Sequence, residues 1–346
     1  MRLFPLMSLC LLGLGCSAKS DHGFVSTGEA AGLAPGGSGL SPWGSCGEGT
    51  PVDRFSDAVV QMAPPPGSQN VSAQTPIVLF MAEDYSLADI DAFDVTSNGW
   101  AIDGDLVELD REGAPVIGFA PLDPYDPASE VIVELDVAGE RSEWQFHTGP
   151  YETSVAGDPN LSFESTATAQ GVECEYTFFT DNFIGFGDVA FTDAAAGSTG
   201  ATHGEARLLM TTGEVLGNAS VRGTTSFVTS QPLPFVSAPE LWIDYQVVAE
   251  TSDADAEPHS DSFLVLAHGA QGVVFEEIAR INAIPESETS PAEFPGLVNA
   301  RATPWETHVV TGFNQVGADA TITLFITDVG STGQTSAVSV DNLRPQ

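Results

Sequence analysis

The stretch that most constrains the fold is Ala320 to Leu343, where two runs of alternating apolar and small polar residues flank a glycine-rich turn. The runs are Thr321 to Thr327 and Ala337 to Leu343, and a period of two predicts for each a strand with one buried face. Between them, Asp328-Val-Gly-Ser-Thr-Gly is rich in turn-forming residues. The sequence therefore predicts a long hairpin. Its inward side chains are Leu324, Ile326, Val338 and Val340.

Acidic residues dominate the charge of the chain. Its 346 residues include 48 Asp and Glu against 10 Lys and Arg, which gives a formal net charge of −38 at pH 7. A surface of this sign repels nucleic acid and favours solubility and divalent cations. We expect no nucleic-acid partner. Export into a saline setting and simple solubility both remain open as explanations of the acid excess.

The first 15 residues have the features of an export signal. Met1-Arg2 is a short basic region, and Leu3 to Gly15 is an apolar region of signal-peptide length. Its end, Gly15-Cys16, looks like a bacterial lipobox, which implies a lipid anchor on Cys16 at the outer membrane or cell surface. Gly13 stands where the lipobox usually has leucine, so ordinary cleavage and secretion remain an alternative.

A low-complexity segment and two cysteines follow. Residues 16–42 are rich in Gly, Ser, Ala and Pro and are expected to form a flexible tether, followed by an N-terminal extension over 43–63. In an oxidising compartment Cys46 and Cys174 either form a disulfide or remain two unpaired buried thiols.

Residues 64–150 have the pattern of a small β-sandwich, with short β-rich runs separated by Asp, Gly and Pro turns. Pro66-Gly67, Phe119-x-Pro121 and Phe146-x-Thr148-Gly149 resemble motifs of the bacterial Ig-like domain of S-layer proteins. That resemblance implies a spacer role. The predicted strand runs are Ile77 to Met81, Phe93 to Thr96, Val116 to Phe119, Val131 to Leu135 and Trp144 to Thr148.

Residues 157–346 resemble a second family. Phe163-Glu164, Gly185 to Asp188 and Gly204 to Gly213, followed by the closing motif Ser336 to Asn342, are similar to the choice-of-anchor jelly-roll domains and, more distantly, to jelly-roll carbohydrate-binding modules. The expected fold is therefore all-β, an Ig-like sandwich followed by a larger jelly-roll sandwich.

The resemblance also implies a candidate calcium site. In similar jelly rolls a first-strand glutamate and a last-strand aspartate meet, which here suggests Glu164, Asp188 and Asp341 as ligands of a structural Ca²⁺ ion. Ser331 and Thr335 stand where that family commonly has acids. The alternative is that these are solvent-facing acids in an acidic protein.

Three aromatic residues are candidates for stacking against sugar rings: Trp242, Tyr245 and Trp305. Trp242 and Tyr245 have opposite parity on one strand, so they are expected on opposite faces. No zinc motif or nucleophile elbow is found. A hydrolytic carboxylate pair would have to come from Glu240, Asp244 or Glu250.

Together these features predict a non-catalytic cell-envelope lipoprotein whose Ig-like spacer presents a jelly-roll domain for adhesion to a polysaccharide or to another surface protein. A purely structural envelope protein is the first alternative, and a glycoside or polysaccharide hydrolase is the second.

The lipobox makes a direct prediction. Cys16→Ala removes the only thiol at the predicted cleavage site, so the protein should leave the membrane fraction and appear in the soluble fraction, as judged by immunoblotting after fractionation. Cys10→Ala, inside the signal peptide, is the matched control. Unchanged membrane association of Cys16→Ala would contradict lipidation at this residue.

Overall fold

The computed structural model describes most of the chain from residue 57 onward, and these residues belong to one compact unit. The predicted signal peptide, tether and anchor residue Cys16 lie outside the described residues, as do Cys46, Cys174 and Glu164. No helix among the described residues is long and apolar enough to cross a membrane. The described ranges are 57–69, 71–109, 111, 113–149, 161–163, 168–169, 176–179, 183–193, 202–204, 206–212, 225–234, 238–250, 261–281, 284–294, 297, 299–327 and 335–346.

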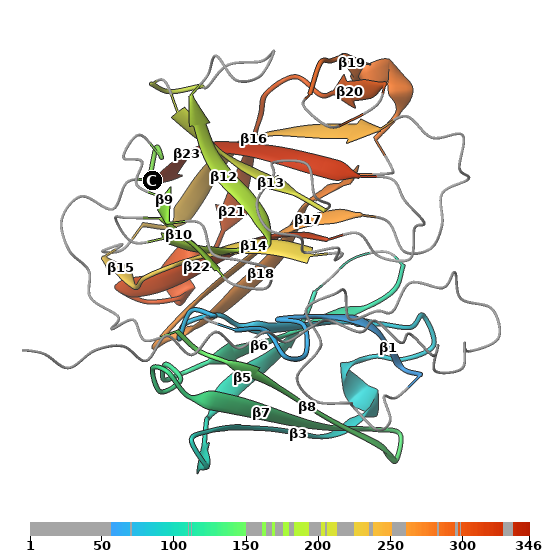
Figure 1. Cartoon of the computed structure of the whole chain (residues 1–346), viewed down its shortest axis with the longest axis vertical. Helices are drawn as coiled ribbons and strands as arrows, with labels where there is room; N and C mark the ends of the chain where they lie inside the picture. Colours follow the sequence, from blue (N-terminus) through green and yellow to red (C-terminus); the bar gives the residue numbers. More distant parts are fainter. Residues whose placement is uncertain are drawn as a thin grey trace, which may run out of the picture. The chain divides into compact units, whose positions relative to one another are not determined.

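Two antiparallel sheets form the first sandwich, with strand orders β1-β2-β6-β5 and β4-β3-β7-β8 (Figure 1). The β3–β4 hairpin turns at Asn98 and Gly99, which both have positive φ, as a tight two-residue turn requires. The strands are β1 Val59–Ala63, β2 Ile77–Met81, β3 Ile90–Ser97, β4 Trp100–Ala101, β5 Gly104–Glu108, β6 Val116–Pro121, β7 Glu130–Val137 and β8 Glu140–His147.

The core of this sandwich follows from period-two alternation. In β7, Val131, Val133 and Leu135 are buried while the residues between them are half-buried. Tyr125 and Phe146 pack edge to face, with ring centroids 5.6 Å apart. The five predicted strand runs all lie within strands β2, β3, β6, β7 and β8, apart from the last residue of the fifth run. Strand β1, which the sequence analysis assigned to the 43–63 extension, is part of the first sheet.

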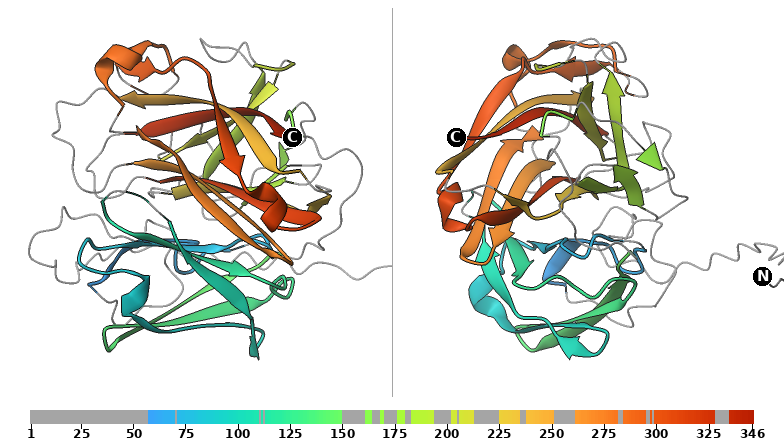
Figure 2. Two further views of the ribbon diagram at one scale, coloured as in Figure 1. Left: turned by 180° about the vertical axis from the view of Figure 1, so that it is seen from behind. Right: turned by 90° about the vertical axis from the view of Figure 1, so that its left-hand side faces the viewer.

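The second sandwich has two larger sheets (Figures 1 and 2). One has the order β18-β17-β22-β14-β11-β10-β9, with β15 also paired to β22; the other has the order β12-β13-β23-β16-β20-β19, with β21 also paired to β16. The strands are β9 Thr168–Ala169, β10 Tyr176–Phe179, β11 Phe183–Phe186, β12 Asp188–Asp193, β13 Ala206–Thr211, β14 Thr225–Ser230, β15 Leu233–Pro234, β16 Glu240–Glu250, β17 Ser262–Gly269, β18 Gly272–Arg280, β19 Ser290–Pro291, β20 Ala300–Ala302, β21 Glu306–Thr311, β22 Asp319–Thr327 and β23 Ser336–Pro345. The all-β prediction is confirmed.

The two final runs are strands, but the hairpin predicted between them is wrong. Strand β22 pairs with β14 and β17 in one sheet, whereas β23 pairs with β13 and β16 in the other. Alternation shows which side chains of a strand are buried, but it does not show which strand lies beside it. In a sandwich the chain can cross from one sheet to the other, so two consecutive strands with inward apolar residues need not pair. The predicted inward set is confirmed within one core cluster: Leu324, Ile326, Val338 and Val340.

Strand β22 is buried on both faces, because the outer face of its sheet packs on the first sandwich. One cross-strand row of that face is apolar and consists of Leu264, Phe325, Phe227 and Phe186. Phe186 and Phe227 stack with centroids 4.9 Å apart, and Phe227 lies 5.7 Å from Phe325. All four share a hydrophobic cluster with Phe80 and its neighbours in the first sandwich. We call this contact the inter-sandwich interface.

On one side of this apolar row lies a polar row of Ser262, Thr327 and Thr225, and on the other side Thr323 and Thr229 lie between Leu266 and Ile184. Gln61 of β1 donates through Nε2 to the hydroxyl oxygens of Thr225 and Thr327, the latter at 2.8 Å. Buried polar groups are tolerated only when they have such partners. Other polar contacts also cross the inter-sandwich interface, among them Thr75 to Thr229 at 3.1 Å, His268 to the carbonyl of Gln74 at 3.1 Å, and the ion pair of Arg111 with Glu277 at 2.9 Å.

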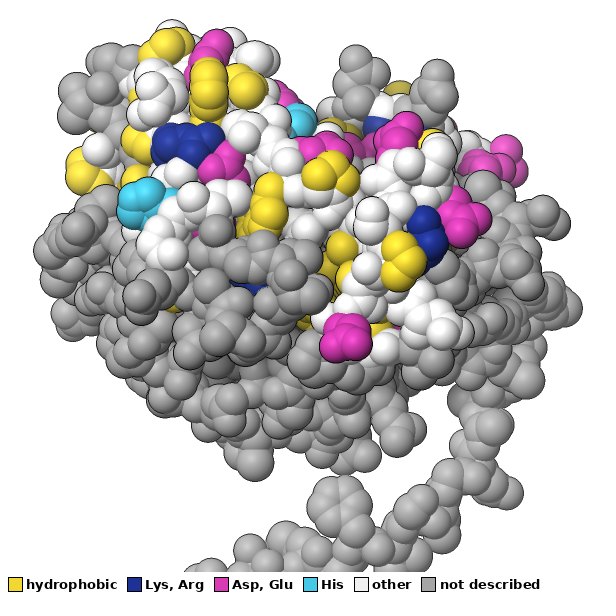
Figure 3. Space-filling view, turned by 90° about the horizontal axis from the view of Figure 1, so that it is seen from above, with side chains coloured by type: hydrophobic (Ala, Val, Ile, Leu, Met, Phe, Trp, Pro, Cys, Tyr) yellow, Lys and Arg dark blue, Asp and Glu magenta, His cyan; other side chains and the backbone are white. Residues whose placement is uncertain are grey.

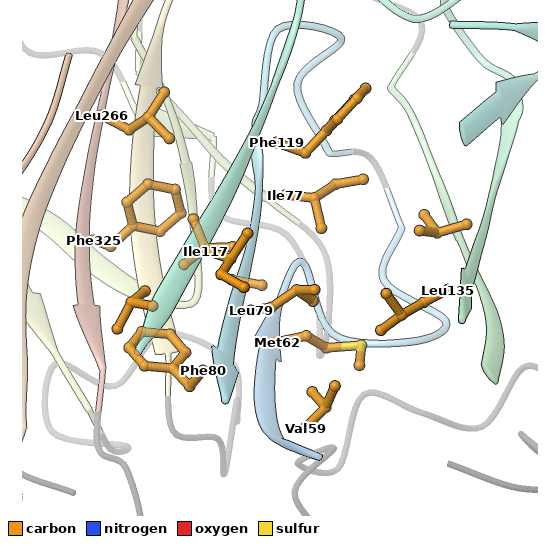
Figure 4. Packing of buried hydrophobic residues seen from close by; sticks show 14 of the residues in the cluster. Val59, Met62, Ile77, Leu79, Phe80, Ile117, Phe119, Leu135, Leu266 and Phe325 are labelled. Carbon is orange, nitrogen blue, oxygen red and sulfur yellow. The ribbon is translucent and has the colours of Figure 1, made fainter. Parts of the chain in front are cut away.

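At Gly118 the two sandwiches approach so closely that an added side chain would have to displace its neighbours. A Cβ built on Gly118 of β6 would lie 2.8 Å from Leu266 Cδ1 and 3.3 Å from the ring of Phe275. Figure 4 shows Phe325 and Leu266 on one side of β2 and β6, with Leu79 and Phe119 on the other. The sheet containing β2 and β6 is therefore packed on both faces, as its continuous apolar run Ile77 to Met81 requires.

A buried histidine lies at the end of β17 in the inter-sandwich interface. Burial lowers the pKa of His268 to about 4, although hydrogen bonds to the carbonyls of Gln74 and Pro121 act in the opposite direction. Its hydrogen-bond partners, the carbonyls of Gln74 and Pro121, and its ladder neighbours, Thr321 and Val273, carry no charge. The interface therefore holds His268 in its neutral form.

This pKa shift predicts a pH dependence. Because the folded-state pKa lies below the unfolded value of 6.5, the stabilisation is complete above pH 6.5 and is lost as the pH falls toward 4. The loss should be about 3 kcal/mol in the free energy of unfolding. Urea unfolding across this range should show the extra slope for the wild type and not for His268→Gln. Parallel pH profiles of the two proteins would contradict the assignment.

Candidate functional site

The outer face of the β16 sheet carries the strongest cluster of polar and aromatic side chains. Residues Leu241, Ile243 and Tyr245 of β16 point into the core, so Trp242 and Asp244 between them point outward. One half of this outer face is covered by Phe294 and its neighbours, which pack on Leu209, Val248 and Ala337. The other half carries Trp242 and is the candidate site.

Asp244 is held by a dense set of donors. Arg344 of β23 binds it through two parallel hydrogen bonds, Nη1 to Oδ2 at 2.6 Å and Nη2 to Oδ1 at 2.7 Å. The Thr307 hydroxyl donates to Oδ1 at 2.6 Å, and the Asn342 side-chain amide lies 3.3 Å from Oδ2. Burial alone would raise the pKa of Asp244, but Arg344 and the threonine hydroxyls outweigh it, so the pKa is lowered. Asp244 is therefore ionised and fully engaged.

Asp341 lies directly opposite Asp244 in the β16–β23 ladder. Its Oδ2 accepts the backbone N–H groups of Thr202 and His203, at 2.6 and 2.7 Å. The hydroxyl of Thr202 lies 2.9 Å from this oxygen and 3.2 Å from Oδ2 of Asp244, so it links the two carboxylates. Burial raises the pKa of Asp341 despite these hydrogen bonds. The charge of Arg207, itself buried, lies close enough to favour the ionised form of Asp341.

These residues form a line of charges across three strands. Extending the β13–β23 register by one pair places Arg207 of β13 beside Asp341 of β23, which lies opposite Asp244 of β16. Arg344, three residues after Asp341 on β23, binds Asp244. The two cations balance the two carboxylates. The line therefore fixes the register of β13, β23 and β16 beneath the candidate site.

Trp242 lies beside this line and is exposed, with 36% of its surface accessible. Its indole N–H donates to Oε2 of Glu240 at 2.7 Å, and the guanidinium of Arg344 lies 5.8 Å from its ring centroid. Arg344 is in turn fixed by Asp244, so the indole is held in one orientation. An exposed but positioned aromatic ring is the feature that most distinguishes this face.

The other candidate aromatics are placed differently. Tyr245 is buried in the core against Phe263, and its hydroxyl donates to Glu306 at 2.9 Å. Trp305 is half-buried just before β21. Trp242 and Tyr245 therefore do lie on opposite faces of β16, and of the three only Trp242 is exposed.

The candidate calcium ligands are only partly described. Glu164 lies outside the described residues, and for Asp188 only its backbone position at the start of β12 is described. Asp341 contacts hydrogen-bond donors. Among the side chains that are described, no group of three or more His, Cys, Asp or Glu is placed to hold a metal. The calcium site thus stays a prediction.

The sequence did not predict the roles of Arg344 and Thr202. It also did not predict the set of hydrogen bonds from Arg344 and Thr307 that holds Asp244, which we call the Asp244 clamp. The one sequence feature that could have pointed to this contact is the order Asp341-Asn342-Leu343-Arg344 at the end of an alternating strand. Asn342 has a φ of 51°, a left-handed position that asparagine tolerates, and the ladder shifts register there. This bulge turns Arg344 onto the same face as Trp242.

The clamp predicts unequal costs for two arginines. Arg344→Met leaves Asp244 nearly buried without its main partner and should lower the free energy of unfolding by about 3 kcal/mol. Arg141→Met, which breaks the exposed Arg141–Glu134 pair, is the control and should cost less than about 1 kcal/mol. Chemical denaturation measures both. Equal small effects would show that the clamp is not a structural element.

No protein-family model matches the chain, and no curated protein matches it. Solved structures resemble it weakly. A study of carbohydrate-binding modules of the β-sandwich superfamily provides one, at 14% identity and a TM-score of 0.26, covering 82% of this chain and 94% of that one. The N-terminal part of the bacterial S-layer protein SbsC is 11% identical, with a TM-score of 0.21 and coverage of 47% and 38%. Bacteroides uniformis β-glucuronidase 2 is 9% identical, with a TM-score of 0.21 and coverage of 80% and 28%. The fold assignment therefore rests on the strand order and registers.

Proposed function

We propose that this chain is an exported, lipid-anchored, non-catalytic surface protein whose second sandwich binds polysaccharide at Trp242. The observation that carries the proposal is the exposed indole of Trp242, fixed by Glu240 and Arg344 beside the buried charges of the β16 sheet. A sugar ring presents C–H groups on one face, and an indole presents a π-face of matching size and complementary polarity.

The fixed orientation of the indole supports binding over simple exposure. An aromatic ring that is already ordered loses little conformational freedom when a ligand stacks on it, which raises affinity at a given contact area. Trp100 provides a contrast within the same chain. It is 74% exposed, and it follows a tight hairpin turn rather than lying on a broad sheet face.

A non-catalytic role fits the carboxylates near Trp242. Asp244 has its two oxygens bound by Arg344 and Thr307, and Glu240 accepts the indole N–H. A glycosidase needs one carboxyl free to donate a proton and a second free to act on the sugar or on water. Of the acids named as a hydrolytic pair, Asp244 is committed to Arg344.

The anchor and tether complete the proposed role. A lipidated Cys16 would hold the chain at the membrane surface, and residues 16–42 would separate the sandwiches from it. The strongly acidic composition would keep the presented part soluble and clear of anionic headgroups.

A purely structural envelope role is the second candidate, and the inter-sandwich interface favours it. Gln61, Gly118 and the apolar row of Phe325 and its neighbours make the two sandwiches a stiff unit, which is suited to a stalk or lattice component. Such a role needs no ligand at Trp242.

Trp242→Ala tests the binding proposal. The mature chain should be retarded in affinity electrophoresis through at least one soluble polysaccharide, and this substitution should weaken the retardation tenfold or more. The variant should stay folded, because the side chain that is removed lies at the surface with 36% of its area accessible. Trp100→Ala, the matched control, should bind like the wild type. No retardation by any polysaccharide, or equal losses in both variants, would favour the structural alternative.

A further inference from the structure

On the described surface the basic side chains lie in pairs with acidic ones. Each arginine among the described residues has a carboxylate partner, and Figure 3 shows basic side chains lying beside acidic ones. The pairs are Arg111 with Glu277, Arg141 with Glu134, Arg207 with Asp341, Arg280 with Glu277, Arg301 with Glu286, and Arg344 with Asp244.

This pairing leaves the acid excess uncompensated. With 48 acidic residues against 10 basic ones in the whole chain, most carboxylates have no basic residue available to them. The resulting negative potential raises the local concentration of cations and lowers that of anions. A ligand that carries carboxylates or sulfates would therefore be repelled, and the described face offers it no unpaired arginine.

The basic side chain next to Trp242 is also paired with a carboxylate. Arg344 lies over the ring, and among the described residues its bidentate contact with Asp244 already neutralises it. Glu240 lies at the ring edge, half-buried, and accepts the indole N–H through Oε2. A group that approaches the ring from this edge meets a carboxylate.

We propose that the Trp242 face selects glycans that carry amino groups, namely polymers of amino sugars with free ammonium groups, over neutral glycans and strongly over acidic ones. This inference rests on the proposed binding function at the same residue. The indole supplies contact with the sugar face, Glu240 accepts a hydrogen bond from an ammonium group, and the net negative surface concentrates the polycation.

The expected contributions have distinct signatures. A half-exposed carboxylate–ammonium contact is worth up to about a fivefold change in Kd. The long-range attraction is screened as the Debye length shortens from about 30 Å at 0.01 M salt to about 8 Å at physiological ionic strength. Stacking on Trp242 is insensitive to salt by comparison. Varying the salt concentration and the charge of the oligosaccharide therefore distinguishes the electrostatic selectivity from stacking on Trp242.

The test uses three oligosaccharides of equal length: a deacetylated glucosamine oligomer, its N-acetylated counterpart and an oligogalacturonate. Calorimetric titration of the mature chain at low and high salt should rank the glucosamine oligomer first and the oligogalacturonate last, with the difference shrinking at high salt. Glu240→Gln keeps an oxygen for the indole N–H and should weaken only the glucosamine oligomer, about fivefold. Glu143→Gln, an exposed acid on β8 of the first sandwich, is the control and should change nothing.

The outcomes separate the two proposals. Trp242-dependent binding with equal affinity for the glucosamine and N-acetylated oligomers, or tighter binding of oligogalacturonate, would overturn the charge selectivity while leaving glycan binding in place. Equal effects of Glu240→Gln and Glu143→Gln would overturn the role of Glu240. Absence of binding to all three oligomers and to the wider polysaccharide panel would overturn both proposals.

Discussion

Burial of the outer face of the β22 sheet against the first sandwich is the constraint on which the rest of the structure depends. Its apolar row would otherwise expose Phe325, Phe227 and Phe186 together, a contiguous apolar patch of the kind that folded proteins usually cover. Beside this row Thr225 and Thr327 are buried, and Gln61 of the first sandwich donates hydrogen bonds to both. Each sandwich thus covers apolar surface of the other and forms hydrogen bonds with its buried polar groups.

This arrangement decides where a ligand can bind. The larger sandwich has two outer faces, and the inter-sandwich interface covers one of them. Phe294 and its neighbours cover half of the other. The remaining half is positioned by the charge line from Arg207 to Arg344, which also orients Trp242. The buried charges that fix the strand register therefore also fix the orientation of the exposed Trp242 ring. The fold and the proposed function thus depend on the same residues.

Much of the fold was predictable from alternation alone, including the inward side chains of β22 and β23. The neighbouring elements were not: the threonines of β22 alternate with apolar residues as a solvent-facing row would, yet Thr323 and Thr327 are buried. Thr327 is bonded by Gln61 of the first sandwich, and Thr323 donates to Thr229 of β14, which in turn bonds Thr75. At the site, parity placed Trp242 and Tyr245 on opposite faces. The contact of Arg344 with Asp244 joins residues 100 positions apart and depends on a bulge, so no local pattern reveals it.

Calorimetric unfolding of the mature chain tests the mutual dependence of the two sandwiches most directly. If the sandwiches depend on each other, the chain unfolds in a single transition whose calorimetric enthalpy equals its van't Hoff enthalpy, as for one cooperative unit. The same dependence predicts that Gly118→Val, which forces Leu266 and Phe275 away, lowers the temperature of that whole transition. Two separate transitions, with only one of them shifted by Gly118→Val, would contradict it and show that the sandwiches are independent domains.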